Sequence, residues 1–447
     1  MTGSASAPRR DPGAVLALGF GTTVAMWAAG YFLRLPWIQA PSALVALVML
    51  GLLAGGGFLA GRFAGGWRTG ALAGLLTMAL NMLILGSLLT SADAPNQFRP
   101  GAAIWLPGAL LAGAAIGALA ALAGSSGRGP DRPSPNWIGV FAGVAAAATL
   151  GLVTIGGLVT SNDAGLAVVD WPNSFGYNMF LYPLSRMTGG IYYEHAHRLF
   201  GSLVGLTTLV LAIVLWRTEE RGWVKRLALL AFVLVVVQGI LGGLRVTGRF
   251  TLSADPAHTA PSLALAVVHG VTGQLFFALM VALAVVTTRR FRDPAPPEAV
   301  PAAATERGLS SLLVGTLIVQ LVLGAVLRHT GTGLLVHISM ATLVAGLAVA
   351  AGVRAWGLYG RIGTMRRAGQ TLLALVAVQL TLGVGALAAV TMRRPETAAP
   401  LWEAIVTTSH QVTGALLLAS GVALAIWCRR LILPAAAPLR SGVAEPA

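Results

Sequence analysis

The sequence predicts an all-α membrane protein that crosses the bilayer about twelve times. Hydrophobic residues make up 56% of its 447 residues, and charged residues only 10%. Apolar stretches close to the ~20 residues that a helix needs to cross a bilayer core follow one another along the chain. Because lipid offers no hydrogen-bond partner to backbone N–H and C=O groups, these spans are expected to be helices.

The apolar stretches define the predicted spans 13–33, 41–61, 69–92, 102–124, 137–160, 192–216, 223–246, 262–288, 309–328, 332–357, 368–391 and 403–427. Arginine and lysine cluster in every second connection, as in Arg217, Arg221, Lys225 and Arg226. By the positive-inside rule, these connections and both termini are cytoplasmic. The net charge of +15 therefore reflects membrane topology, and no nucleic-acid partner is expected. High alanine, glycine and arginine content suggests a bacterial chain and hence the inner (cytoplasmic) membrane.

Two polar, proline-rich segments divide the chain, one near residue 130 and one near residue 300. The predicted domains are an extra N-terminal four-helix bundle of unknown role (1–125), a linker (126–136), a first four-helix repeat (137–292), a cytoplasmic linker (293–308), a second four-helix repeat (309–430) and a disordered tail (431–447). The N-terminal bundle has no histidine and, apart from Asn81, few polar groups in its spans. No chemistry is assigned to it.

Recurring phrases indicate an internal duplication. His269-Gly-Val-Thr-Gly recurs 141 residues later as His410-Gln-Val-Thr-Gly, and Val237–Gly242 recurs at the same offset as Val378–Gly383. A fainter copy occupies Val319–Gly324. One four-helix unit is therefore expected to have been copied once, which gives two bundles related by a pseudo-twofold axis.

Four histidines, His197, His269, His337 and His410, come early in helices predicted to run from outside to inside. Six to ten residues past the helix starts, they are expected roughly 9–15 Å from the outer face. Ionisable groups inside a membrane are costly and usually functional. Paired imidazoles suit heme iron, whereas the single cysteine, Cys428, and the scarcity of nearby carboxylates disfavour thiolate clusters, di-iron and zinc centres.

The first repeat carries a carboxylate that the second lacks. Glu194 is three residues before His197, so both are expected on one face of a helix. Such a carboxylate can move a proton or stabilise positive charge on a macrocycle edge. The alternative is an interfacial Glu194 that pairs with Arg198 or caps the helix start. Arg198 is a candidate to bind a heme propionate, or a snorkelling arginine at the interface.

Other residues near the four histidines have two interpretations each. Small residues would let a flat macrocycle approach the backbone, or serve ordinary close helix packing, and they are Gly201, Gly270, Gly273 and Gly414. His258 and His329 are expected in outer connections, where His329 could contact a propionate. A solvated or structural role is the alternative for both, and for His195, which lies off the face of Glu194 and His197.

Residues 137–427 resemble the heme A synthase family. The similar segments, in chain order, are Gly156–Pro172, Glu194-x-x-His197-Arg198, Gln238–Val246, His269, Leu327–Leu334 and His410–Leu416. The resemblance implies oxidation of the C8 methyl group of heme O to the formyl group of heme A by successive hydroxylations. It further implies that the first repeat receives heme O and the second holds a heme b cofactor.

Carried onto this sequence, the resemblance makes His197 and His269 the ligands of the substrate iron, His337 and His410 the ligands of heme b, and Glu194 the carboxylate needed for turnover. Implied partners are a heme O synthase and a heme-copper oxidase. Membrane lipid is a further expected partner, and a homo-oligomer is a candidate assembly. Two features depart from the family: the loop 161–190 lacks a cysteine pair, and 1–125 has no counterpart. The rival functions are a di-heme b-type electron-transfer cytochrome and, less favoured, a heme transporter.

Overall fold

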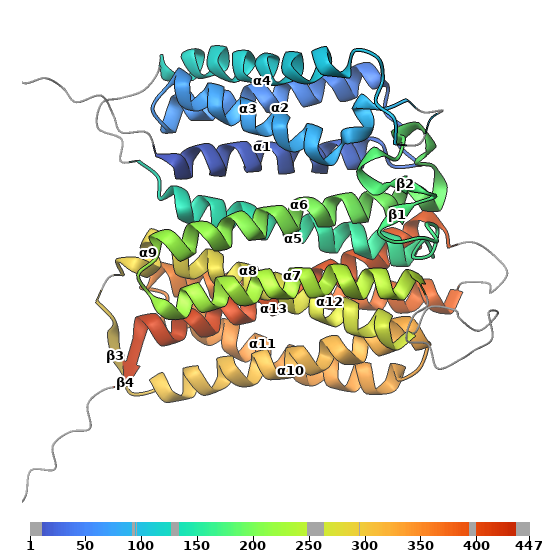
Figure 1. The fold of residues 1–447 in the computed structure, drawn as a ribbon. Helices are drawn as coiled ribbons and strands as arrows, with labels where there is room; N and C mark the ends of the chain where they lie inside the picture. Colours follow the sequence, from blue (N-terminus) through green and yellow to red (C-terminus); the bar gives the residue numbers. More distant parts are fainter. Residues whose placement is uncertain are drawn as a thin grey trace, which may run out of the picture. The chain divides into compact units, whose positions relative to one another are not determined.

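The computed structural model describes residues 11–91, 94, 96–126, 134–247, 263–294, 296–392 and 399–434 (Figure 1). Twelve of its helices are long and apolar enough to cross a membrane, which confirms the all-α polytopic fold and the predicted number of spans. His258, much of the predicted linker 126–136 and most of the predicted tail lie outside the described residues. The predicted domain boundaries and pseudo-twofold axis stay predictions.

The chain forms two compact units, Met1–Thr288 with Thr381–Ala415, and Arg289–Leu380 with Leu416–Ala447. The first unit contains α1 (Pro12–Leu33), α2 (Ser42–Phe63), α3 (Trp67–Ile84), η1 (Gly86–Leu89), α4 (Ala102–Ser125), α5 (Trp137–Ser161), β1 (Asn173–Ser174), β2 (Tyr177–Asn178), η2 (Met179–Leu181), η3 (Leu184–Arg186), α6 (Gly189–Thr218), α7 (Gly222–Thr247) and α8 (Leu263–Thr287). The second contains α9 (Arg289–Arg292), β3 (Glu298–Val300), α10 (Ala303–Thr330), α11 (Leu334–Gly357) and β4 (Ile432–Pro434). The division falls within α12 (Gly363–Met392) and α13 (Leu401–Leu431).

The predicted third span, 69–92, is wrong at its end. Helix α3 stops at Ile84, and the short 3₁₀ helix η1 follows. A Cβ added at Gly86 would lie 2.9 Å from the side chain of Leu181, and the hydroxyl of Thr90 donates to the backbone oxygen of Leu181 at 3.4 Å. The chain therefore leaves the helix where it packs against the loop between α5 and α6.

Glycines let the N-terminal helices approach each other closely. A Cβ added at Gly61 on α2 would lie 2.0 Å from the backbone oxygen of Ala121 on α4, and one at Gly70 on α3 would lie 2.4 Å from the backbone oxygen of Gly117. Small residues at contacts of this kind drive helix association in lipid, where the hydrophobic effect between helices is weak. The same bundle holds one buried polar pair, in which the indole of Trp27 donates to Asn81 Oδ1 at 2.8 Å.

Helix α1 packs against α5 and α6 through aromatic side chains. The rings of Phe20 and Phe141 have centroids 5.3 Å apart, and Tyr31 stacks on Tyr192 at 5.4 Å. The Tyr192 hydroxyl donates to the backbone oxygen of Tyr31 at 2.6 Å. Since Tyr192 lies on α6, the N-terminal bundle is in direct contact with the helix that carries His197.

The second unit has a buried ion pair near one end of α10 and α11. Glu306 on α10 accepts hydrogen bonds from the Nε atom of Arg354 at 2.9 Å and from the hydroxyl of Tyr359 at 3.1 Å. Burial, followed by the neighbouring Glu306 carboxylate, raises the pKa of Tyr359 to about 12. In the same unit, β3 and β4 pair in parallel, with Glu298 opposite Ile432.

Candidate functional site

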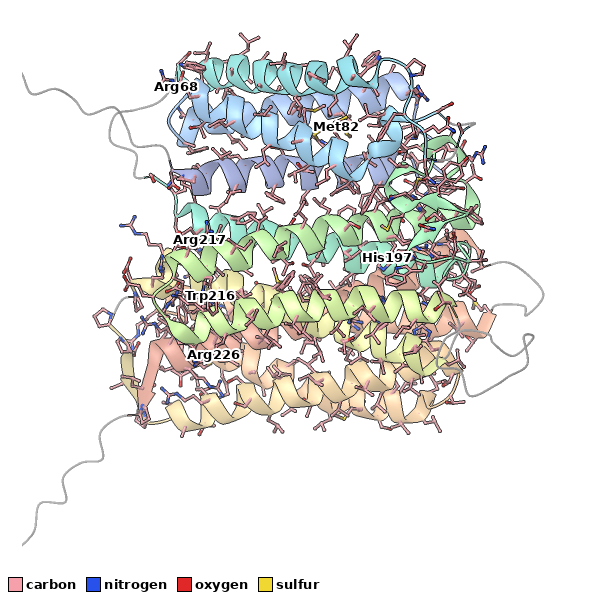
Figure 2. All side chains as sticks on the ribbon, in the orientation of Figure 1. Arg68, Met82, His197, Trp216, Arg217 and Arg226 are labelled. Carbon is pink, nitrogen blue, oxygen red and sulfur yellow. The ribbon has the colours of Figure 1, made fainter. Side chains whose placement is uncertain are left out.

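Two of the four histidines face each other in the first unit. His197 on α6 and His269 on α8 have ring centroids 6.3 Å apart and ring planes at 80°. Imidazoles that bind one iron from opposite sides, each with a metal–nitrogen distance of about 2 Å, have centroids about 6 Å apart. Figure 2 shows His197 toward the end of α6 that lies beside the α5–α6 loop. The pair thus has the separation expected of axial ligands.

Two buried polar atoms beside this pair lack partners among the described residues. They are Nδ1 of His197 and Nε of Arg245. Arg245 comes from α7 and lies near enough to His197 and Glu194 to interact with them electrostatically. An unsatisfied buried donor or acceptor is costly and points to a group that binds there. An anionic group such as a propionate would satisfy Nε of Arg245, and an iron ion would bind one nitrogen of the His197 ring, so these residues fit a heme.

Each of the four histidine rings rests against a glycine of the preceding long helix. An added Cβ would lie close to the ring atom Cε1 in every case: 3.0 Å for Gly156 and His197, 3.6 Å for Gly242 and His269, 3.1 Å for Gly324 and His337, and 3.2 Å for Gly383 and His410. Cε1 lies between the two ring nitrogens, so a side chain at these positions would press on the edge that binds a metal. The sequence analysis did not assign these glycines a role, although three of them end the repeated phrase.

Glutamines of the same phrase contact two of the histidines. Gln320 donates to the backbone oxygen of His337 at 3.1 Å and has its Nε2 atom 3.2 Å from Nδ1 of that ring. Gln238, with its amide nitrogen turned toward His269, donates to the backbone oxygen and Nδ1 of His269, both at 3.1 Å. These contacts hold the two rings in place. A ring that binds a metal through Nε2 donates its Nδ1 proton, so a glutamine donor at Nδ1 does not itself select that tautomer.

Glu194 is buried, with 4% of its surface exposed, and both of its oxygens are occupied. Oε1 accepts from Nη2 of Arg198 at 2.7 Å, and Oε2 accepts from the backbone N–H of Val168 at 2.8 Å. The ion pair given as the alternative in the sequence analysis is therefore present. It does not test the catalytic role, which stays a prediction.

Arg198 ties the α5–α6 loop (residues 162–188) to α6. Besides Glu194, its Nη atoms donate to the backbone oxygens of Val168, Asp170 and Asn173 at 2.7–3.0 Å. All four N–H groups of the two terminal nitrogens are thus directed at Glu194 and the loop. A propionate contact would have to use Nε or displace one of these bonds, and it stays a prediction.

His195 has a structural environment. It is fully buried, its Nδ1 atom lies 3.1 Å from the hydroxyl of Ser174, and its ring is 4.9 Å from that of Tyr182. Asp170 orders the same loop by accepting from the backbone N–H groups of Phe175 at 2.7 Å and Gly176 at 2.9 Å. The loop is therefore fastened to α6 through His195 as well as through Glu194 and Arg198.

The remaining predicted site residues lie as follows. His410 is on α13 within the first unit, whereas His337 and His329 belong to the second. His337 comes three residues after Leu334, the first residue of α11, so the expected depth of six to ten residues is wrong for this histidine. His329 lies in the last turn of α10 and not in a connection, because that helix continues to Thr330.

The glycines selected from the sequence differ in their surroundings. A Cβ added at Gly201 or Gly270 would meet nothing within 4 Å, whereas one at Gly273 would lie 3.5 Å from Oε1 of Gln238. Close helix packing therefore does not explain Gly201 and Gly270. Both leave open space beside the histidine pair, where a flat ring system could approach the backbone.

Residues 139–337 match the family model of COX15-CtaA, described as a cytochrome oxidase assembly protein. The matched segment is similar to this family and covers less than half of the chain. The COX15-CtaA match includes His197, His269 and His337 together with Glu194.

Two relatives are similar to this chain. A heme A synthase of Rhodopseudomonas palustris (strain BisA53) is 26% identical over 235 residues, which cover 47% of this chain and 60% of the relative. A protoheme IX farnesyltransferase of Haloarcula marismortui is 32% identical over 142 residues, which cover 31% of this chain and 28% of the relative. The matches thus span less than two thirds of either relative. No solved structure matches the chain.

Proposed function

We propose that this chain is a heme A synthase that oxidises the C8 methyl group of heme O to a formyl group. The facing pair of His197 and His269, with ring centroids 6.3 Å apart inside the family-matched segment, carries the proposal. The buried, unsatisfied atoms of His197 and Arg245 beside it support an anionic heme as the bound molecule. The similarity to a heme A synthase supports the same reaction.

In this proposal His197 and His269 bind the iron of the substrate from opposite sides and so fix the macrocycle next to Glu194. Bound iron and macrocycle supply the redox chemistry. The carboxylate of Glu194, which pairs with Arg198, would offset positive charge that develops on the macrocycle beside it. Its contact with Val168 keeps the α5–α6 loop closed over α6 and excludes water.

The wider assignments follow from the resemblance and stay predictions. They are heme b as the resident cofactor with His337 and His410 as its ligands, cytoplasmic termini in an inner membrane, and a heme O synthase and a heme-copper oxidase as functional neighbours. In a synthase, the second heme would provide a route for the electrons removed from the substrate.

The test is heme analysis after co-expression with a heme O synthase in a host that lacks heme A. Extracted hemes are separated by chromatography with mass detection for the wild type and for Glu194→Gln. A glutamine has a single oxygen, which can accept from the Val168 N–H or from Arg198 but not from both, so the variant removes the charge and one of the two contacts at nearly unchanged side-chain volume. The matched control is Glu219→Gln, because Glu219 is equally buried and pairs with Arg221 at 2.8 Å at the opposite end of α6.

Formation of formyl heme by the wild type and by Glu219→Gln, with about a hundredfold less from Glu194→Gln, is the expected result. Wild-type protein that is well expressed and heme-loaded yet yields only heme B and heme O would overturn the proposal in favour of an electron-transfer cytochrome. Full activity of Glu194→Gln would leave the synthase standing but remove the role of the carboxylate charge.

A further inference from the structure

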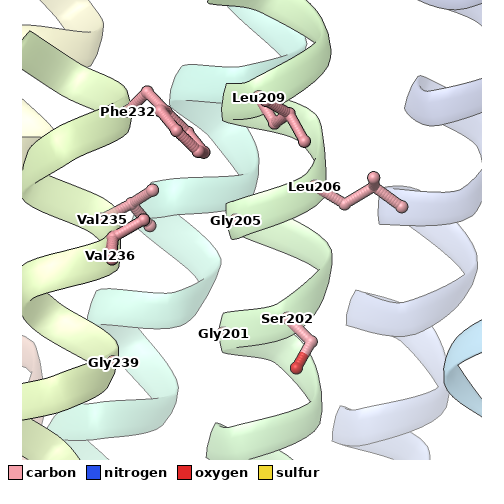
Figure 3. A pocket seen from close by; sticks show the side chains of 9 residues that line it. All are labelled: Gly201, Ser202, Gly205, Leu206, Leu209, Phe232, Val235, Val236 and Gly239. Atoms are coloured by element: carbon pink, nitrogen blue, oxygen red, sulfur yellow. The ribbon is translucent and has the colours of Figure 1, made fainter. Parts of the chain in front are cut away.

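A groove of about 380 Å³ runs between α6 and α7 in the first unit. Its walls are apolar apart from one hydroxyl, and the lining residues are Gly201, Ser202, Gly205, Leu206, Leu209, Phe232, Val235, Val236 and Gly239 (Figure 3). The hydroxyl, on Ser202, already donates to the backbone oxygen of Arg198 at 3.1 Å. The groove therefore offers no free polar group and suits a hydrocarbon chain.

Three glycines make this groove. A Cβ added at Gly201, Gly205 or Gly239 would meet nothing within 4 Å. Glycines that serve helix packing in the same unit, such as Gly61, would meet a backbone atom at 2.0 Å. Glycine costs about 0.5–1 kcal/mol relative to alanine inside a helix, and these three leave room between α6 and α7 that a hydrocarbon chain can fill.

The groove begins one helical turn away from His197 on α6. Gly201 follows His197 by one turn of α6, and Gly239 precedes Gly242 by one turn of α7. Gly242 is the glycine against which His269 rests. From Gly201 to Leu209 the groove extends about 12 Å along α6, at 1.5 Å per residue. A molecule held between the two rings can therefore extend a chain directly into it.

We propose that this groove binds the isoprenoid tail of the heme substrate. The inference rests on the proposed function, since heme O differs from heme B by such a tail. Ligation by His197 and His269 alone leaves the macrocycle free to rotate about the axis that joins the two ligands, and a propionate at Arg245 restrains only one edge of it. A tail seated between α6 and α7 removes that freedom and sets which edge of the macrocycle faces Glu194. The groove thereby selects both the substrate and the methyl group that reacts.

An added Cβ at Gly205 or Gly239 meets nothing within 4 Å, so Gly205→Leu and Gly239→Leu place a side chain into the groove from its two walls. Their control is Gly55→Leu on α2, where an added Cβ likewise meets nothing within 4 Å. Full-length protein that retains its resident heme, in lipid nanodiscs, is titrated with heme O and separately with heme B. Binding is followed by the absorption change that His197→Ala abolishes.

Each groove variant is expected to weaken heme O binding about tenfold while heme B binding and the control change by less than about twofold. Equal losses for both hemes, or no loss for heme O, would overturn the inference and leave the synthase untouched; the second result would mean that a lipid acyl chain fills the groove. A wild type that shows no His197-dependent binding of either heme would overturn both the groove and the proposed function.

Discussion

Gly156→Ala tests most directly whether the histidine rings need a glycine beside them in order to bind heme. The new methyl carbon would lie 3.0 Å from Cε1 of His197, whereas carbon atoms in contact prefer about 3.5–4.0 Å. The ring or α5 must therefore move by about 0.5–1 Å, and overpacking of this kind costs about 1–3 kcal/mol. Since Cε1 adjoins the metal-binding nitrogen, most of that cost is expected to appear in ligand binding, as a loss of about tenfold to a hundredfold.

The assay is the same heme titration, read out as affinity and as the spectrum of the bound heme. Two further alanine substitutions, at glycines with a looser contact or none, show whether the loss of heme affinity follows the closeness of the contact. Gly242→Ala places its Cβ 3.6 Å from His269, an ordinary contact, so a change of less than about threefold is expected. Gly143→Ala, on the same helix as Gly156, meets nothing within 4 Å and should bind heme like the wild type. Equal affinities and spectra for all three variants would refute the idea that glycine seats the ring.

Three further results are expected. Gly61→Leu should prevent close packing of α2 on α4, because a Cβ there lies 2.0 Å from a backbone oxygen, and should lower the unfolding free energy by about 3 kcal/mol in thermal unfolding; an unchanged Tm would contradict the glycine-packed interface. Asn81→Leu removes the acceptor for Trp27 and should cost about 0.6 kcal/mol and at most about 1.7, also read from Tm. Because the pKa of Tyr359 is raised from 10.0 to about 12, its neutral form is favoured in the fold. The stability advantage of the wild type over Tyr359→Phe should be complete below pH ~10 and disappear as the pH rises through about 12, and a difference in Tm independent of pH would contradict the bond to Glu306.

The spans were predictable because a helix that crosses hydrocarbon must be apolar over about 20 residues, so its approximate bounds are visible in the hydropathy of the sequence. The third failed at its end, since the packing of Gly86 against Leu181 is a contact between distant segments that composition does not reveal. The pairing of Glu194 with Arg198 was open to prediction because residues four apart share a helix face.

Other parts of the site have no signature in the sequence. The bond from Val168 to Glu194 uses a backbone N–H, which any residue supplies. The open space above Gly205 and Gly239 depends on how α6 and α7 diverge, and glycine alone does not distinguish a groove from a close contact. The seat of His269 on Gly242 did leave a signal, because Gln238 and Gly242 recur together in the repeated phrase.

The contacts between the four glycines and the histidine rings have a consequence for the assembly of the protein in the membrane. In each case the glycine and its histidine belong to successive long helices, as with Gly156 on α5 and His197 on α6. A helical hairpin is the first tertiary unit that a polytopic chain can complete as it enters the bilayer. Each hairpin can therefore set the rotamer of its own imidazole before a neighbouring hairpin packs against it. Duplication of an ancestral sequence would then have copied a hairpin whose histidine was already oriented. Ligand capture then needs only that two such preset hairpins meet.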